Sequence, residues 1–107
     1  MQYLNMSMVK GDTLCFGVKI TGTDQLFGVW FSCKKNPDDT EYIFQKETGR
    51  GIDLVEPRVY RVRVAPRDTQ NVESGTYYYD LQIKNHDDIY TILQGTLTIN
   101  HEITKEW

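Results

Sequence analysis

The sequence predicts an all-β fold, and more closely a seven-stranded antiparallel immunoglobulin-like β-sandwich. Three observations lead to this prediction. Apolar residues recur with a period of two, the segments with this period are short, and turn-forming residues separate them at nearly regular spacing. A five- or six-stranded barrel is the main alternative.

A single domain is expected, because 107 residues is close to the commonest domain length. Neither a linker nor an internal repeat divides residues 1–107. The core is expected within about residues 9–100, followed by a short C-terminal tail at 101–107.

Each expected strand carries apolar residues at alternate positions. In chain order the strands lie at residues 3–8, 13–20, 29–34, 42–46, 60–64, 77–83 and 89–100. Their apolar phases contain Leu4, Met6 and Met8; Leu14, Phe16, Val18 and Ile20; Val29, Phe31 and Cys33; Tyr60, Val62 and Val64; Tyr77, Tyr79, Leu81 and Ile83; and Leu93, Leu97 and Ile99. The segment at 42–46 is short and mixed, which is typical of a sheet edge. In the last strand, Gly95 indicates either a β-bulge or the close approach of another backbone.

The segments between the strands are rich in Gly, Asn, Asp and Pro, as turns are. They lie at residues 10–12, 22–24, 36–39, 48–51 and 85–88, and the last is expected to close a hairpin. Residues 66–70 are expected to form one helical turn.

One local pattern supports the sandwich. Gly75-Thr76-Tyr77 matches the start of strand F in immunoglobulin-like domains, where a tyrosine hydroxyl bonds back to the preceding loop. Tyr79 then lies where antibody domains have their second cysteine. Alternation places Cys15 outside and Cys33 inside, so the two thiols are expected to stay free.

Composition and charge exclude several functions. The net charge of −3 argues against binding to duplex nucleic acid, which is typical of strongly basic domains. No apolar segment is long enough to span a membrane. Residues 1–10 lack the pattern of a signal peptide. The histidines and paired aspartates lack catalytic or metal-ligand spacing, so we expect no enzyme, no cofactor and no metal site.

Two surface features are candidates for binding. By alternation, Trp30, Tyr78, Tyr90 and Ile92 fall on the outer face of three neighbouring strands and form a candidate interaction face. Arg61 and Arg63 share the solvent-facing side of the strand at 60–64, as a candidate basic stripe. Cross-strand ion pairs are the alternative explanation for these arginines.

Several motifs together resemble a known family. They are Gly11-Asp12-Thr13, Ala65-Pro66-Arg67-Asp68-Thr69, the segment from Gly75 to Ile83 and the segment from Tyr90 to Ile99. The chain resembles immunoglobulin-like virion domains of phages and prophages, in particular the N-terminal domain of baseplate upper proteins of phages of Gram-positive bacteria. The likeness covers about residues 9–100 and does not extend to the helical linker and trimerising part of those proteins.

The resemblance implies a non-enzymatic structural or assembly protein in the tail or baseplate of a tailed phage or prophage particle. Other virion or tail proteins are the implied partners, with a homo-oligomer as a further expectation. Such a protein would be made in the cytoplasm and incorporated into the virion. The alternative is a carbohydrate- or protein-binding β-sandwich module of a bacterial host. We also expect residues 103–107 to pair with a neighbouring subunit by strand addition.

Overall fold

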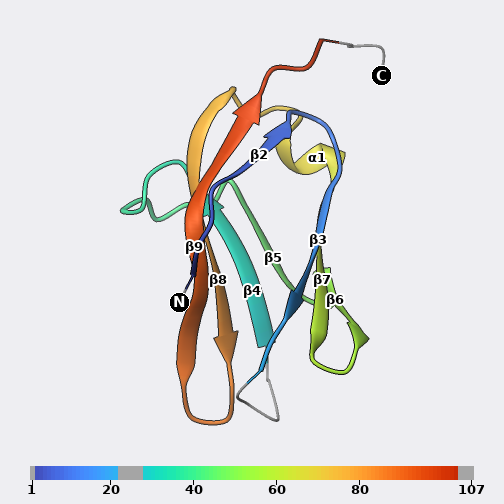
Figure 1. Ribbon diagram of the computed structural model, residues 1–107. Helices are drawn as coiled ribbons and strands as arrows, with labels where there is room; N and C mark the ends of the chain where they lie inside the picture. The colour runs from blue at the N-terminus through green and yellow to red at the C-terminus, as the bar shows by residue number, and fades with distance from the viewer. Residues whose placement is uncertain (1, 22–27, 104–107) are drawn as a thin grey trace.

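The computed structural model describes residues 2–21 and 28–103, and these form an all-β fold with one short helical turn (Figure 1). The elements in chain order are β1 (Gln2–Tyr3), β2 (Met6–Val9), β3 (Leu14–Lys19), β4 (Gly28–Lys34), β5 (Phe44–Thr48), β6 (Gly51–Glu56), β7 (Val59–Val64), α1 (Pro66–Thr69), β8 (Gly75–Lys84) and β9 (Ile89–Asn100). The predicted all-β class is therefore confirmed.

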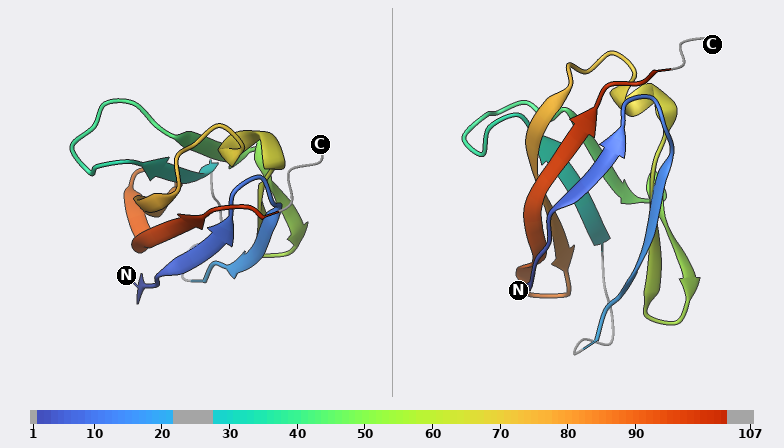
Figure 2. Two further views of the ribbon diagram at one scale, coloured as in Figure 1. Left: turned by 90° about the horizontal axis from the view of Figure 1, so that it is seen from above. Right: turned by 45° about the horizontal axis from the view of Figure 1, so that its top comes forward.

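The strands form two packed layers joined into one curled sheet. The strand order is β1-β9-β8-β4-β5-β6-β7-β3, and β2 also pairs with β9. One short parallel pairing between β5 and β6, of two residue pairs, connects the layers, so the sheet curls around a common core (Figure 2).

The strand count and pairing differ from the prediction in three places. The expected strand at 3–8 is broken at Asn5, whose side-chain oxygen accepts from the Thr96 backbone N–H at 3.2 Å and hydroxyl at 3.1 Å. The resulting β1 and β2 both run parallel to β9. Strand β6 was not predicted, because several of its apolar side chains are exposed and blur the alternation. The strand expected at 42–46 lies two residues later, in β5.

An aromatic cluster fills the centre of the core. Phe31 on β4 is fully buried, and its ring centroid lies 5.3 Å from that of Phe16 on β3 and 5.3 Å from that of Tyr79 on β8. Antibody domains have a tryptophan packed on a disulfide between the layers at the corresponding place. Here Cys33 is buried and Cys15 is exposed, and both are free thiols.

The predicted local motifs are present. The Tyr77 hydroxyl donates to the Glu73 carbonyl oxygen, which forms the tyrosine corner. The Asn85 side-chain oxygen accepts from the backbone N–H of Asp87 at 3.0 Å and of Asp88 at 2.8 Å, and so closes the β8–β9 hairpin. The helical turn also forms, and the Asp68 carboxylate accepts from the Ala65 N–H at 2.7 Å.

Candidate functional site

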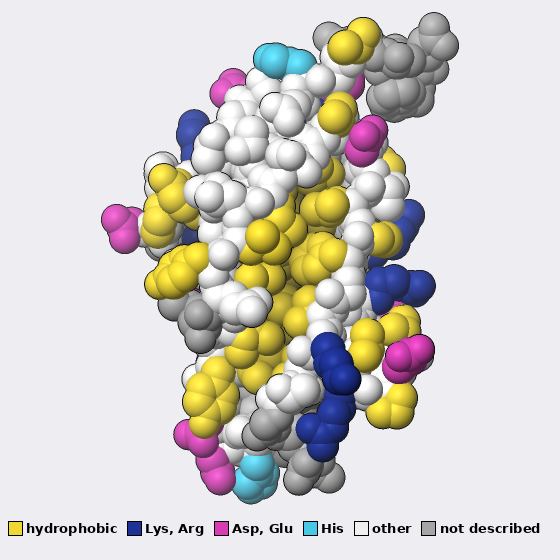
Figure 3. All heavy atoms as spheres, in the orientation of Figure 1, with side chains coloured by type: hydrophobic (Ala, Val, Ile, Leu, Met, Phe, Trp, Pro, Cys, Tyr) yellow, Lys and Arg dark blue, Asp and Glu magenta, His cyan; other side chains and the backbone are white. Residues whose placement is uncertain are grey.

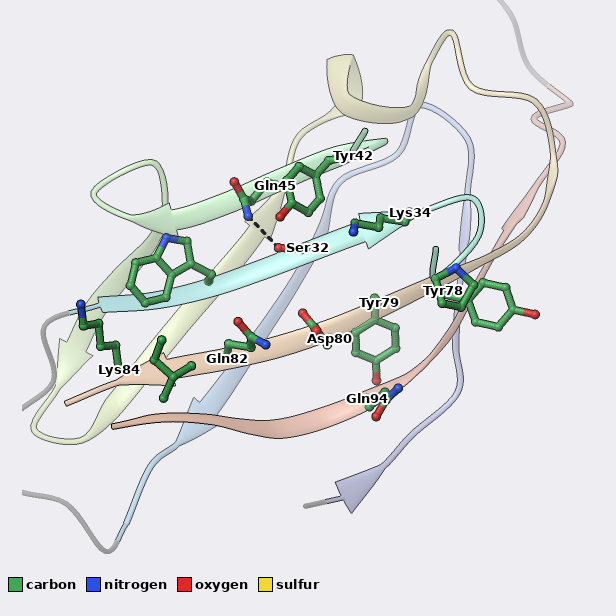
Figure 4. A pocket seen from close by; sticks show the side chains of 13 residues that line it. Ser32, Lys34, Tyr42, Gln45, Tyr78, Tyr79, Asp80, Gln82, Lys84 and Gln94 are labelled. Carbon is green, nitrogen blue, oxygen red and sulfur yellow. Dashed lines mark hydrogen bonds between the residues drawn. The ribbon is translucent and has the colours of Figure 1, made fainter. Parts of the chain in front are cut away.

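The outer face of strands β5, β4, β8 and β9 carries a shallow hollow of about 660 Å³ (Figure 4). Its lining mixes aromatic rings with polar side chains. The lining residues are Trp30, Ser32, Lys34, Pro37, Tyr42, Gln45, Tyr78, Tyr79, Asp80, Gln82, Lys84, Ile89 and Gln94. We call this surface the outer hollow.

Strand register brings the two predicted aromatic residues to opposite ends of the outer hollow. Trp30 lies opposite Gln82 and Lys34 lies opposite Tyr78 in the antiparallel β4–β8 pair. Trp30 and Tyr78 are therefore separated by four residues along the strands, or about 13 Å. A single small ligand would have to lie along the sheet to reach both.

Trp30 is held flat along its strand. A Cβ at Gly28 would lie 2.6 Å from the Trp30 Cη2 atom, so only a glycine leaves room for the indole in this position. The indole Nε1 donates to the Glu47 carboxylate on β5 at 3.3 Å. These contacts fix the ring and keep part of its face accessible, which reduces the entropy lost when a partner binds.

The middle of the outer hollow is polar. Ser32 on β4 lies opposite Asp80 on β8, which in turn lies opposite Gln94 on β9. The Gln45 amide donates to the Ser32 hydroxyl at 2.9 Å. Figure 4 shows Gln45, Ser32 and Asp80 on three neighbouring strands and Gln94 on the fourth. Hydroxyl, amide and carboxylate groups therefore form a continuous row of hydrogen-bonding groups.

The carboxylate of Asp80 is the electrostatically unusual group in this row. Burial raises the pKa of Asp80 above its ordinary value of 3.8, and the positive charge of Lys34 partly opposes the rise. The Lys34 ammonium itself lies 5.0 Å from the centroid of the Tyr42 ring, within cation–π range. Asp80 is thus a partly desolvated acceptor that a hydrogen-bond donor on a partner could satisfy.

Two residues of the predicted interaction face do not lie on it, and this part of the prediction is wrong. The β8–β9 register shifts between Leu81 and Gln82, and it leaves Ile92 as an extra residue in β9. Ile92 packs against the core. Because side chains alternate between the two faces of a strand, the extra residue moves the side chains at positions 89–91 to the face opposite the predicted one.

Tyr90 therefore lies opposite the buried Ile83, in the core-facing phase at the end of the strand, where half of its surface is exposed. Ile89 takes the outer phase instead, opposite Lys84. The outer face thus presents Trp30, Tyr78 and Ile89. Alternation along 30–34 and 78–84 could also have identified the polar row, because it shares the phase of Trp30 and Tyr78.

The predicted basic stripe lies on the other layer of the sandwich. Arg61 and Arg63 are both exposed on the outer side of β7. The Arg61 guanidinium lies 3.4 Å from the carboxylate of Asp53 on β6, so one of the two arginines forms the cross-strand ion pair given as the alternative. Arg63 lies opposite Cys15 on β3.

Two negative findings, on a metal site and on a membrane-spanning helix, apply to the described residues. Within residues 2–21 and 28–103, no group of three or more His, Cys, Asp or Glu side chains is placed to hold a metal ion. In the same part of the chain, no helix is long and apolar enough to cross a membrane.

Comparison with known proteins supports the fold and leaves the family open. No family model and no curated protein matches this sequence. The fold matches that of a solved structure, an extracellular domain of the voltage-gated sodium channel beta4 subunit. That domain is described as a parallel homodimer whose structures explain its role in cell–cell adhesion. The two chains are 9% identical, superpose with a TM-score of 0.52, and the match covers 94% of this chain and 93% of the other. The chain therefore has an immunoglobulin-like fold.

Proposed function

We propose that this chain is a non-enzymatic binding module that recognises another protein through the outer hollow. The observation that carries this proposal is the combination of exposed aromatic rings and a row of polar side chains on one sheet face. Trp and Tyr are enriched where proteins bind each other, because they bury a large area at small entropic cost. The structural neighbour, described as a homodimer that mediates cell–cell adhesion, uses the same fold for protein–protein contact.

The setting we propose is the tail or baseplate of a tailed phage or prophage particle. The motifs at residues 11–13, 65–69, 75–83 and 90–99, which resemble phage virion domains, support this setting. Partners would then be other tail proteins or further copies of this chain. The DNA that flanks the gene tests the setting first, because tail, tape-measure or portal genes are expected on either side. Flanking metabolic or cell-surface genes would contradict it.

A binding experiment tests the proposed surface. The proteins encoded beside the gene are purified, immobilised one at a time and titrated with this chain, while sedimentation velocity measures self-association. Trp30→Ala and Tyr78→Ala are expected to weaken the contact by about tenfold or more each. Tyr90→Ala is the matched control, because Tyr90 is as exposed as Tyr78 and lies in the opposite phase.

A carbohydrate ligand is the second candidate, favoured by the row of hydroxyl, amide and carboxylate groups between Trp30 and Tyr78. In that case the isolated chain would bind a bacterial polysaccharide without any protein partner, and Trp30→Ala would abolish binding. Retention of the chain on a polysaccharide column, together with no binding to the neighbouring proteins or to itself, would replace the proposed protein partner with a sugar.

A further inference from the structure

Strand β3 forms one end of the curled sheet, and it pairs with β7 along one edge. The Ile20 N–H donates to the Arg58 carbonyl oxygen at 2.8 Å. Because hydrogen-bonded and non-hydrogen-bonded pairs alternate in an antiparallel ladder, the backbones of Leu14, Phe16 and Val18 also point toward β7. The N–H and C=O groups of Cys15, Gly17 and Lys19 then point to the opposite edge, where none of the described strands pairs with β3.

An apolar band lies beside this edge. Figure 3 shows it as hydrophobic side chains that remain visible between β3 on one side and β2 and β9 on the other. On β3, Leu14, Phe16 and Val18 face the core yet are only partly buried. Met6 on β2 and Ile92 on β9 are partly buried against the same core. An additional strand beside β3 would cover these side chains with its own alternate apolar residues.

The outer surface beside this edge is basic. Cys15 and Gly17 have short side chains, and they lie opposite Arg63 and Arg61 of β7. The long side chain of Arg63 can therefore extend across β3 toward a strand at its edge, whereas the Arg61 guanidinium is held on the other side of β7 by Asp53 of β6. Lys19 adds a further positive charge in the same exposed phase. Residues on the outer side of an incoming strand would be stabilised if they were acidic.

We propose that the β3 edge is a docking site for an extended segment of a protein partner, which adds to the sheet as a strand. The segment alternates apolar residues, which fill the band beside Phe16, with acidic residues, which face Lys19 and Arg63. Main-chain hydrogen bonds supply the pairing, and the two side-chain phases supply the selectivity. This site lies at the sheet edge, apart from the outer hollow, and is independent of the function proposed for that surface.

A designed peptide is the probe: acetyl-Thr-Val-Glu-Val-Glu-Val-Thr-amide with a fluorescent label, compared with the same peptide in which Lys replaces Glu. Fluorescence anisotropy is expected to show saturable binding of the glutamate peptide, with the lysine peptide bound about tenfold or more weakly. Hydrogen exchange of the Cys15, Gly17 and Lys19 amides is expected to slow when the glutamate peptide is bound. Absence of binding, or equal binding of the two peptides, would overturn the proposal.

Two pairs of variants locate the site. Gly17→Pro removes an N–H that points to the open edge, whereas Gly17→Ala keeps this N–H. The alanine fits without a clash, because a Cβ at position 17 would lie 3.9 Å from its nearest neighbour, the Tyr60 carbonyl oxygen. Proline is expected to abolish peptide binding and alanine to leave it intact. If proline disturbs folding, Arg63→Glu provides the second test, against Lys35→Glu in an exposed turn with the same change in charge.

Arg63→Glu is expected to weaken the glutamate peptide about tenfold and to strengthen the lysine peptide. Equal affinity in Arg63→Glu and Lys35→Glu would contradict the proposal. Sedimentation velocity provides a further check. If the chain alone forms a dimer, and Gly17→Pro dissociates this dimer, the proposal is also contradicted, because a second copy of β3 would then occupy the edge.

Discussion

The backbone of Leu4 runs so close to Gly95 that a Cβ at position 95 would lie 1.9 Å from the Leu4 carbonyl oxygen. The same carbonyl oxygen accepts from the Tyr79 hydroxyl at 2.6 Å, and the Leu4 N–H donates to the Gln94 carbonyl oxygen at 2.9 Å. Of the two explanations that the sequence offered for Gly95, close approach of another backbone is therefore confirmed. The chain has room at this point for a glycine and for no other residue.

Gly95→Ala is accordingly expected to destabilise the protein by about 1–3 kcal/mol, because the added methyl group must displace backbone. Urea unfolding measures this change, and faster hydrogen exchange at Leu4 would show that β1 has detached. Gly17→Ala is the control, since its Cβ meets no close neighbour. Equal stability of the two variants would contradict the close approach.

Tyr77→Phe removes the tyrosine corner and leaves the Glu73 carbonyl oxygen without this donor. Tyr77 is buried, and this burial, followed by the charges of Glu73 and Cys33, raises the pKa of its hydroxyl, which therefore remains protonated as a donor. The expected loss of stability is about 1–2 kcal/mol by urea unfolding. Tyr78→Phe, on the neighbouring exposed ring, should change stability by less than about 0.5 kcal/mol.

The two thiols should differ widely in reactivity. Burial raises the pKa of the Cys33 thiol to about 12, and its side chain is fully buried, whereas Cys15 is exposed. A thiol reagent at pH 8 should label one cysteine per native chain, identified by mass spectrometry as Cys15, and two after unfolding in urea. Labelling of Cys33 in the native protein at a rate similar to Cys15 would show that this part of the core opens.

Asp80→Asn should raise the stability of the protein near neutral pH. Desolvation raises the pKa of Asp80 in the folded state, so its charged form is disfavoured by folding. The contribution of Asp80 to the free energy of unfolding is therefore largest below its ordinary pKa of 3.8, where the carboxyl group is protonated in both states. This contribution is lost as pH rises through the pKa of Asp80 in the folded state.

Urea unfolding at a series of pH values measures this effect. The advantage of Asp80→Asn over the native chain should shrink as pH falls toward the ordinary pKa of Asp80. Asp87→Asn, in the exposed hairpin turn, makes the same change in net charge and serves as the control. An advantage that is the same size for both variants would indicate a general charge effect.

Alternation together with regularly spaced turns predicted the fold class, the Gly75-Thr76-Tyr77 motif predicted the tyrosine corner, and alternation alone predicted the positions of Trp30 and Tyr78. These features depend on local sequence, since a buried strand face repeats every second residue. The same rule failed at Tyr90 and Ile92. The bulge at Ile92 leaves apolar residues on both sides of the shift, so the sequence pattern contains no sign of the reversed phase.

The outer hollow could be predicted only in part, for a related reason. Its two ends follow from strand phase, but Tyr42 and Pro37 come from the connection between β4 and β5, and Ile89 depends on the bulge in β9. Similarly, β6 became recognisable only through its pairing with β7, because Leu54 and Val55 are exposed although apolar. The predicted strand addition by residues 103–107 falls almost entirely outside the described residues and stays a prediction.

The central claim is that the outer face of β4 and β8 is the recognition surface. The most direct test compares the affinity of Trp30→Ala for the partner with that of Tyr90→Ala. Both variants remove one partly exposed aromatic ring, and only Trp30 lines the outer hollow. We predict that Trp30→Ala binds the partner at least about tenfold more weakly than Tyr90→Ala, which should bind like the native chain. Equal affinities, or a greater loss in Tyr90→Ala, would contradict the account.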